Sequence, residues 1–127
     1  MWYNYLSNTE FLRMLYDEIP LLKNVRIASI SIGDEGNRVR VIFDMPSYAD
    51  FPPCKWEACN VTVVEVEFFS ISKLTIGSIS NSYRGDISIE KDVEGWLEIT
   101  IEGTLNLSIV AEVGLIQRIS GYQENFD

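Results

Sequence analysis

Residues 60–69 read Asn-Val-Thr-Val-Val-Glu-Val-Glu-Phe-Phe, and this stretch decides the fold because apolar and acidic side chains alternate along it. Successive side chains of a β-strand point to opposite faces of the sheet. One face of this stretch therefore carries Val64, Val66 and Phe68, and the other carries Val63, Glu65 and Glu67. The stretch predicts a strand with one face in the core and the other toward solvent.

The same period of two recurs on both sides of this stretch, with turn-forming residues between the runs. Seven further strands are expected at Val25–Ile32, Arg38–Asp44, Lys73–Ile79, Asp86–Lys91, Trp96–Glu102, Leu105–Glu112 and Leu115–Gly121. No connection between them reads as a crossover helix, which predicts antiparallel pairing. Met45–Cys59 is the long irregular connection, and it carries three of the four prolines.

A helix is predicted ahead of the strands, over residues 8–18. Ser7-Asn8-Thr9-Glu10 has the pattern of a capping box, and Pro20 ends the helical pattern. Four apolar residues recur at helical spacing and form one stripe: Phe11, Leu12, Leu15 and Ile19. The sequence thus predicts a single α+β domain over residues 1–127. Its amino-terminal helix packs on a mostly antiparallel, curved sheet of about seven to eight strands within residues 25–121.

The net charge of the chain indicates which kinds of partner it can bind. The 127 residues include 19 acidic and 10 basic side chains, which give a formal charge of −9 at pH 7. This field repels phosphate backbones and anionic lipid surfaces, which argues against nucleic acid and membrane as partners. The same field attracts a cationic protein and raises its association rate. We therefore expect a cationic protein partner.

The amino terminus and the cysteines indicate the compartment. Met1–Tyr5 lacks the basic region and apolar core of a signal peptide, and no apolar run approaches the ~20 residues that span a bilayer. Cys54 and Cys59 lie together in the proline-rich connection and are expected to remain thiols. We expect a cytoplasmic protein.

The sequence holds no histidine, which removes the commonest general acid–base group and the commonest metal ligand. The eight glycines are scattered and form no phosphate-binding loop. Glu65 and Glu67 lie two residues apart on an expected outward face, where acidic residues are most often solvated. We therefore expect no enzymatic activity, no catalytic residue, no metal site and no cofactor.

Acidic residues on outward strand faces are the candidates for partner binding. Glu98 and Glu102 alternate with the apolar positions of Trp96–Glu102, as Glu65 and Glu67 do in the earlier strand. Asp50 and Trp56, from the proline-rich connection, complete the set of six candidates. Tryptophan is a frequent anchor at binding interfaces, although Trp56 would equally close one end of the sheet as core. The acidic face would also be an ordinary solvated surface.

The order of these features resembles immunity protein family 50 of bacterial polymorphic toxin systems. The most specific element is Pro52-Pro53-Cys54-Lys55-Trp56, which follows the strand that ends in Phe43-Asp44. Further matching segments are Asp17–Pro20, Val25–Ile32, Asn37–Asp44, Phe68-Phe69, Ser72–Gly77 and Ile119–Tyr122. The resemblance implies a non-catalytic cytoplasmic protein that binds a cognate toxin and neutralises it. Many such toxins are nucleases with cationic active sites, which an acidic protein could cover.

Two other functions fit the composition. Outward apolar residues such as Val63 and Trp96 could join copies of the chain into a homo-oligomeric assembly module. A curved sheet could instead enclose a small apolar ligand.

Overall fold

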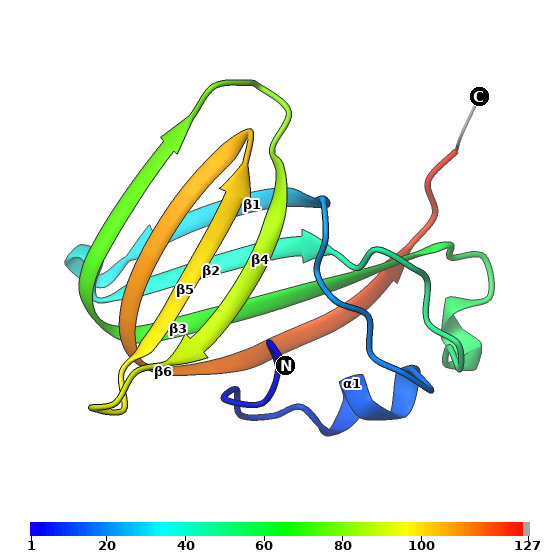
Figure 1. The fold of residues 1–127 in the computed structure, drawn as a ribbon. Helices are drawn as coiled ribbons and strands as arrows, with labels where there is room; N and C mark the ends of the chain where they lie inside the picture. The colour runs from blue at the N-terminus through cyan, green and yellow to red at the C-terminus, as the bar shows by residue number, and fades with distance from the viewer. Residues whose placement is uncertain (126–127) are drawn as a thin grey trace.

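Alternation of apolar and polar side chains shapes a six-stranded antiparallel barrel with the strand order β1-β2-β3-β6-β5-β4 (Figure 1). The computed structural model describes residues 1–125. The elements are α1 (Glu10–Leu15), β1 (Val25–Gly33), η1 (Asp34–Gly36), β2 (Arg38–Asp44), η2 (Cys54–Trp56), β3 (Val61–Ser78), β4 (Arg84–Lys91), β5 (Leu97–Gly103) and β6 (Leu105–Tyr122). The fold is therefore mostly β, with one short helix ahead of a ring-like antiparallel sheet.

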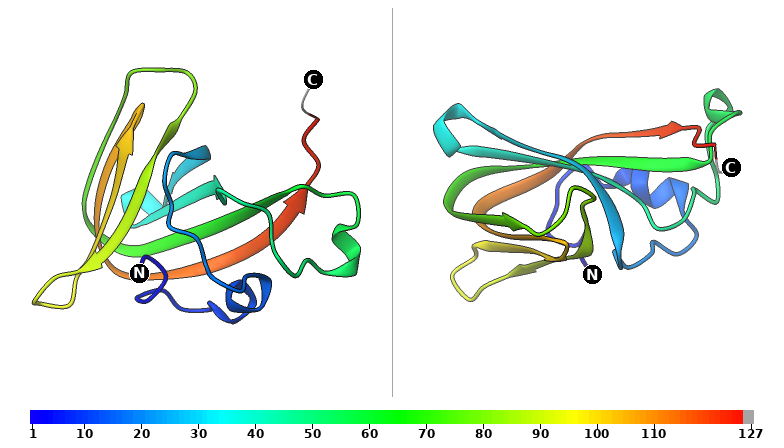
Figure 2. Two further views of the ribbon diagram at one scale, coloured as in Figure 1. Left: turned by 45° about the vertical axis from the view of Figure 1, so that its right-hand side comes forward. Right: turned by 90° about the horizontal axis from the view of Figure 1, so that it is seen from above.

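The expected strand number was too high because β3 and β6 are each 18 residues long. The sequence pattern predicts two strands in place of each of them. In β3 the chain bends at Ser70, where φ is 57°, and the register with β6 shifts between Ile71 and Lys73. A bulge of this kind bends a strand without ending its pairing. Both strands consequently run through the bend of the barrel, as Figure 2 shows.

The interior of the barrel is filled by the side chains that the alternation assigned to it. Val39, Val41 and Phe43 of β2 are each at most 2 % exposed, and Val64, Val66 and Phe68 of β3 at most 1 %. From β5 and β6, the buried side chains are Leu97, Ile99, Ile101, Leu105, Leu107, Ile109 and Ala111. The inward face predicted for Val64, Val66 and Phe68 is confirmed, and the other strands follow the same alternation.

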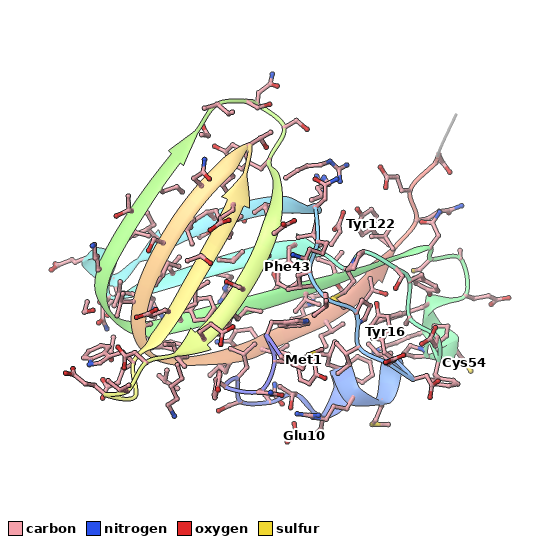
Figure 3. All side chains as sticks on the ribbon, in the orientation of Figure 1. Met1, Glu10, Tyr16, Phe43, Cys54 and Tyr122 are labelled. Carbon is pink, nitrogen blue, oxygen red and sulfur yellow. The ribbon has the colours of Figure 1, made fainter. Side chains whose placement is uncertain are left out.

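The amino-terminal helix is shorter than predicted and starts differently. Ser7 does not cap it, because its backbone N–H donates to the Gly114 carbonyl at 3.0 Å and its carbonyl accepts from Ile116 at 3.0 Å. The helix ends at Leu15, since Tyr16 is extended and its hydroxyl donates to the Ser47 carbonyl at 2.6 Å (Figure 3). Tertiary hydrogen bonds thus override both expected helix ends.

Two residues of the predicted apolar stripe pack on the barrel, while Ile19 lies beyond the end of the helix. Leu12 and Leu15 are 0 % and 1 % exposed, whereas Phe11 is 37 % exposed and meets Trp56 edge-on with ring centroids 6.0 Å apart. None of the described residues forms a helix long and apolar enough to span a bilayer.

Two glycines let β4 and β5 approach closely where the barrel closes. β1 pairs with β4 through Val25↔Gly85 and Arg26↔Arg84. A Cβ atom on Gly103, which pairs with Gly85, would lie only 2.6 Å from the Gly85 Cα atom. Position 103 therefore has no room for a side chain and requires glycine.

Candidate partner-binding surface

The outward face of the β4–β5 hairpin gathers carboxylates from both strands. Glu98 and Glu102 are exposed on β5, while Ile99 and Ile101 between and beside them point into the core. The strand register places Glu90 directly opposite Glu98, and Asp86 directly opposite Glu102. We call the exposed carboxylates of this hairpin the acidic hairpin face: Glu90, Glu94, Glu98 and Glu102.

Like charges that face each other across two strands are costly. Directly opposed residues have Cβ atoms about 4.5–5.5 Å apart, and like charges in this position destabilise a sheet. Asp86 is partly neutralised, because one carboxylate oxygen lies 3.6 Å from Lys23 Nζ and the other accepts from the Asn24 N–H at 2.8 Å. The described residues provide no ion pair for Glu90 or Glu98.

Acidic side chains outnumber basic ones in the hairpin. Residues 84–103 contain six acidic and two basic residues, a net charge of −4. Lys91 continues the series of inward positions Ile87 and Ile89 and is therefore directed away from the outward face, and its Nζ atom lies 5.9 Å from the centroid of the Tyr5 ring. The acidic hairpin face therefore presents a net negative field to solvent.

Glu67 is outward-facing as predicted, yet its carboxylate is already engaged. Its side chain is 6 % exposed and accepts hydrogen bonds from Arg40 at 2.8 Å and from Gln117 at 2.9 Å. Arg38 lies 3.9 Å from the other oxygen. Burial opposes ionisation, but these donors and positive charges outweigh it and lower the pKa of Glu67 below its ordinary value. This carboxylate serves the fold and offers little surface to a partner.

The two pairs of predicted glutamates lie far apart. Glu98 of β5 is opposite Val110 of β6, whereas Glu65 of β3 is opposite Arg118 of the same strand. Eight residues separate the two β6 positions, which corresponds to about 26 Å of strand at ~3.3 Å per residue. Glu65, which is half-buried, is thus not part of the acidic hairpin face.

Asp50 and Trp56 lie in the β2–β3 connection, away from the hairpin (Figure 1). Asp50 is exposed, and its carboxylate accepts the Asp17 N–H at 3.0 Å. Trp56 is 5 % exposed and its ring packs among Phe11, Tyr48 and Gly121. The tryptophan thus packs mainly as core in the free protein, although it also lines a shallow pocket with Tyr48 and Pro53.

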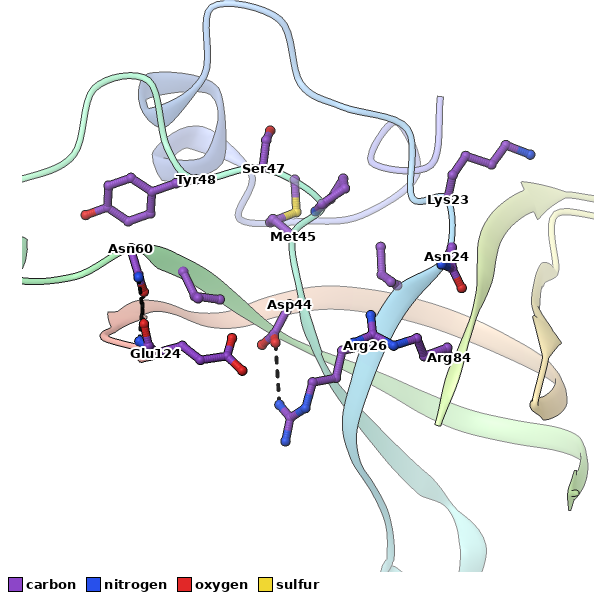
Figure 4. Close-up of a pocket in the computed structure, with 13 residues that line it drawn as sticks. Lys23, Asn24, Arg26, Asp44, Met45, Ser47, Tyr48, Asn60, Arg84 and Glu124 are labelled. Carbon is purple, nitrogen blue, oxygen red and sulfur yellow. Dashed lines mark hydrogen bonds and ion pairs between the residues drawn. The ribbon is translucent and has the colours of Figure 1, made fainter. Parts of the chain in front are cut away.

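A pocket of about 390 Å³ opens beside Asp44 at the end of β2 (Figure 4). Asp44 is 8 % exposed, and one carboxylate oxygen accepts from Tyr122 at 2.7 Å and from Arg26 at 3.4 Å. Burial and the Asp44 carboxylate raise the pKa of Tyr122 to about 12. Lys23, Arg84 and Glu124 also line the pocket, so it mixes both signs of charge, unlike the acidic hairpin face.

Sequence reasoning missed Glu90 and Glu94, although the signal was present. The turn Asp92–Gly95 is held by the Asp92 carboxylate, which accepts the N–H groups of Glu94 and Trp96 at 2.9 Å each. A tight turn fixes the register of its hairpin, so the spacing around it places Glu90 opposite Glu98. Among the described residues, no group of three or more Cys, Asp or Glu side chains could hold a metal ion.

Comparison with known families supplies one match. The family model described as Immunity protein 50 matches residues 8–122, which is nearly the whole chain. No curated protein and no solved structure matches the sequence or the fold significantly.

Proposed function

The chain belongs to the immunity protein 50 family, and from that premise we propose that it neutralises a cognate toxin by binding it through the acidic hairpin face. Family membership implies toxin neutralisation, and immunity proteins are in general inhibitors without catalytic activity. The surface, the charge of the toxin and the mode of inhibition are the proposal.

The opposed pair Glu90 and Glu98 is the observation that carries the choice of surface. In the free protein this pair costs folding free energy, since two carboxylates repel each other across the hairpin. A cationic toxin surface would neutralise the two carboxylates on binding, so relief of their repulsion would add to the binding free energy. Interactions that are more favourable in the complex than in the free protein contribute directly to affinity.

The same face suits rapid capture. The hairpin carries a net charge of −4 within 20 residues, and the whole chain carries −9. A concentrated field of one sign raises the association rate of a cationic partner and loses strength as salt is added. We propose that the hairpin covers a cationic, phosphate-binding cleft of the toxin, which would exclude its substrate. Asp50 and Glu65 are proposed as separate contacts outside the hairpin.

The function is tested first by co-expression. Cells that express the polypeptide encoded beside this chain should grow only when the chain is present, and the two proteins should co-purify. If the neighbouring polypeptide is harmless, or kills regardless of this chain, the proposed pairing is rejected.

The surface is tested with the double substitution Glu98→Gln/Glu102→Gln against the matched control Glu18→Gln/Glu57→Gln. Both variants change the net charge by the same amount, and all four residues are exposed. We expect the association rate with the toxin to fall about tenfold or more for the hairpin variant at low salt, and less than about threefold for the control. Equal rates in the two variants would show that only net charge matters and would remove this face.

A further inference from the structure

The carboxyl-terminal half of β3 has an unpaired edge. β2 lies beside β3 only as far as Arg38↔Phe69, and beyond this pair residues 71–78 bond only to β6 within residues 1–125. Ile79 donates its N–H to the Thr104 carbonyl at 3.0 Å, which fixes the alternation of hydrogen bonds along this segment. The backbone N–H and C=O groups of Leu74, Ile76 and Ser78 therefore point away from β6, toward the free edge.

This edge carries few of the devices that usually protect one: Lys73 is the only charged side chain in residues 72–79, and the segment has no proline. Proteins shield exposed edges with charges, prolines, short strands or covering loops. From Ser72 to Ser80 every residue is exposed except Leu74, and the segment includes two exposed isoleucines, Ile76 at 44 % and Ile79 at 82 %. An exposed edge with apolar side chains readily accepts a further β-strand.

The low charge of this segment indicates which partner strand can pair with the free edge. The 16 residues from Phe68 to Tyr83 include one charged side chain, Lys73, whereas the whole chain has 29 charged residues and a net charge of −9. Two copies of this chain repel each other over most of their surfaces. They meet the least repulsion where both present this nearly uncharged segment.

The segment is also complementary to itself. Antiparallel pairing about a two-fold axis at Ile76 sets Leu74 of one copy against Ser78 of the other, and sets Ile76 against its own copy. The three pairs formed in this way engage the free backbone groups with about six hydrogen bonds. Lys73 then faces Ile79 of the second copy, so no like charges are opposed, and its aliphatic stem can cover that isoleucine.

We propose that the chain forms a two-fold dimer by antiparallel pairing of the free β3 edge, residues 72–79, with the same edge of a second copy. The contact is short, and it buries less than the ~800 Å² per partner of a standard interface, which predicts a weak, concentration-dependent dimer. Because two acidic copies repel each other, added salt should strengthen the dimer, opposite to its effect on capture of a cationic toxin.

The test is sedimentation velocity of the wild-type chain over a range of concentrations, at about 50 mM and about 500 mM NaCl. We expect the mass to rise from that of the 14.5 kDa monomer toward twice that value with concentration, and to rise more at high salt. The substitution Ile76→Lys, which places a charge on the two-fold axis, should weaken association at least tenfold. Val93→Lys in the β4–β5 turn, where the valine is fully exposed, is the matched control and should leave association unchanged.

Circular dichroism melts check that Ile76→Lys remains folded, and its exposed position makes a large loss of stability unexpected. A wild-type chain that stays monomeric at all concentrations overturns the dimer, and so does equal association of the two lysine variants. If Ile76→Lys abolishes protection from the toxin while wild-type mass stays monomeric, the edge receives a strand of the toxin and the dimer is rejected. Loss of the dimer with intact protection would leave the proposed function standing.

Discussion

The Glu67 carboxylate offers a sharp test of how the outer face of the barrel is held together. It accepts hydrogen bonds from Arg40 and Gln117 on the two strands that flank β3, so it joins β2, β3 and β6 across the bend. Glu67→Gln keeps the shape of the side chain and removes its charge. Both donors bond the same carboxylate oxygen, so a glutamine carbonyl can accept both, but only as weaker bonds to a neutral group. The amide NH2 then takes the place of the oxygen that lies 3.9 Å from Arg38, and that ion pair is lost.

The expected loss of stability follows from these contacts. A hydrogen bond to a charged group contributes roughly 1.5–3 kcal/mol when buried. The Arg40 side chain is 42 % exposed and can be hydrated after the substitution, which favours the lower part of that range. We expect Glu67→Gln to reduce the free energy of unfolding by about 2 kcal/mol at pH 7. Glu65→Gln, on the same strand and half-buried, is the control and should cost less than about 0.5 kcal/mol.

The pH dependence of stability tests whether the charge of Glu67 is responsible. The pKa of Glu67 is lower in the folded protein than the ordinary unfolded value of about 4.3. Its ionised form therefore adds stability that is fully present above about pH 4.3 and is lost as the pH falls through the folded pKa. Urea unfolding at several pH values measures this. A difference between wild type and Glu67→Gln that is as large at pH about 2 as at pH 7 would refute a role for the charge.

Three further substitutions, one of them with a matched control, test the packing and the partly buried Tyr122 hydroxyl. Leu12→Ala removes a fully buried side chain of α1 and should lower the free energy of unfolding in urea by about 3 kcal/mol. Gly103→Ala should lower the free energy of unfolding by more than about 2 kcal/mol, because its Cβ would collide with the backbone of β4. The control is Gly77→Ala, whose Cβ would meet no atom within 4 Å, and its melting temperature should stay within a few degrees of wild type. Tyr122→Phe removes a donor from the Asp44 carboxylate and should cost about 1 kcal/mol. Burial, and to a lesser extent the Asp44 carboxylate, raise the pKa of Tyr122 to about 12. The stabilisation by the protonated hydroxyl is therefore fully present below about pH 10 and is lost as the pH rises toward 12, which unfolding at alkaline pH measures.

The sequence predicted faces well because a period of two leaves few choices. Once Val64, Val66 and Phe68 are inward, the side chains between them must be outward, and the structure places them so. The same rule placed Ile99 and Ile101 inside and left Glu98 and Glu102 exposed on β5. Local periodicity carried this information without any knowledge of strand order.

The interruptions were harder to predict, because they depend on contacts between distant residues. Nothing local distinguishes a bulge at Ser70 from the end of a strand, and only the continuous pairing with β6 shows that the strand goes on. Ser7 likewise resembles a helix cap, but its backbone bonds with β6 more than 100 residues away. The buried state of Glu67 depends on Arg40 and Gln117, which other strands bring beside it.

Strand order also decides how the two proposed surfaces relate to each other. The sequence of neighbours β3-β6-β5-β4 puts the free β3 edge and the acidic hairpin face on opposite sides of β6. Pairing at the β3 edge adds strands beyond β3 and leaves the β4–β5 hairpin of each copy uncovered, so a dimer would present two separate acidic faces. Salt acts on the two contacts in opposite directions, because one joins unlike charges and the other joins two acidic chains. Measuring toxin affinity and dimer affinity over a range of salt concentrations therefore distinguishes the two contacts. If one surface served both, salt would change the two affinities in the same direction.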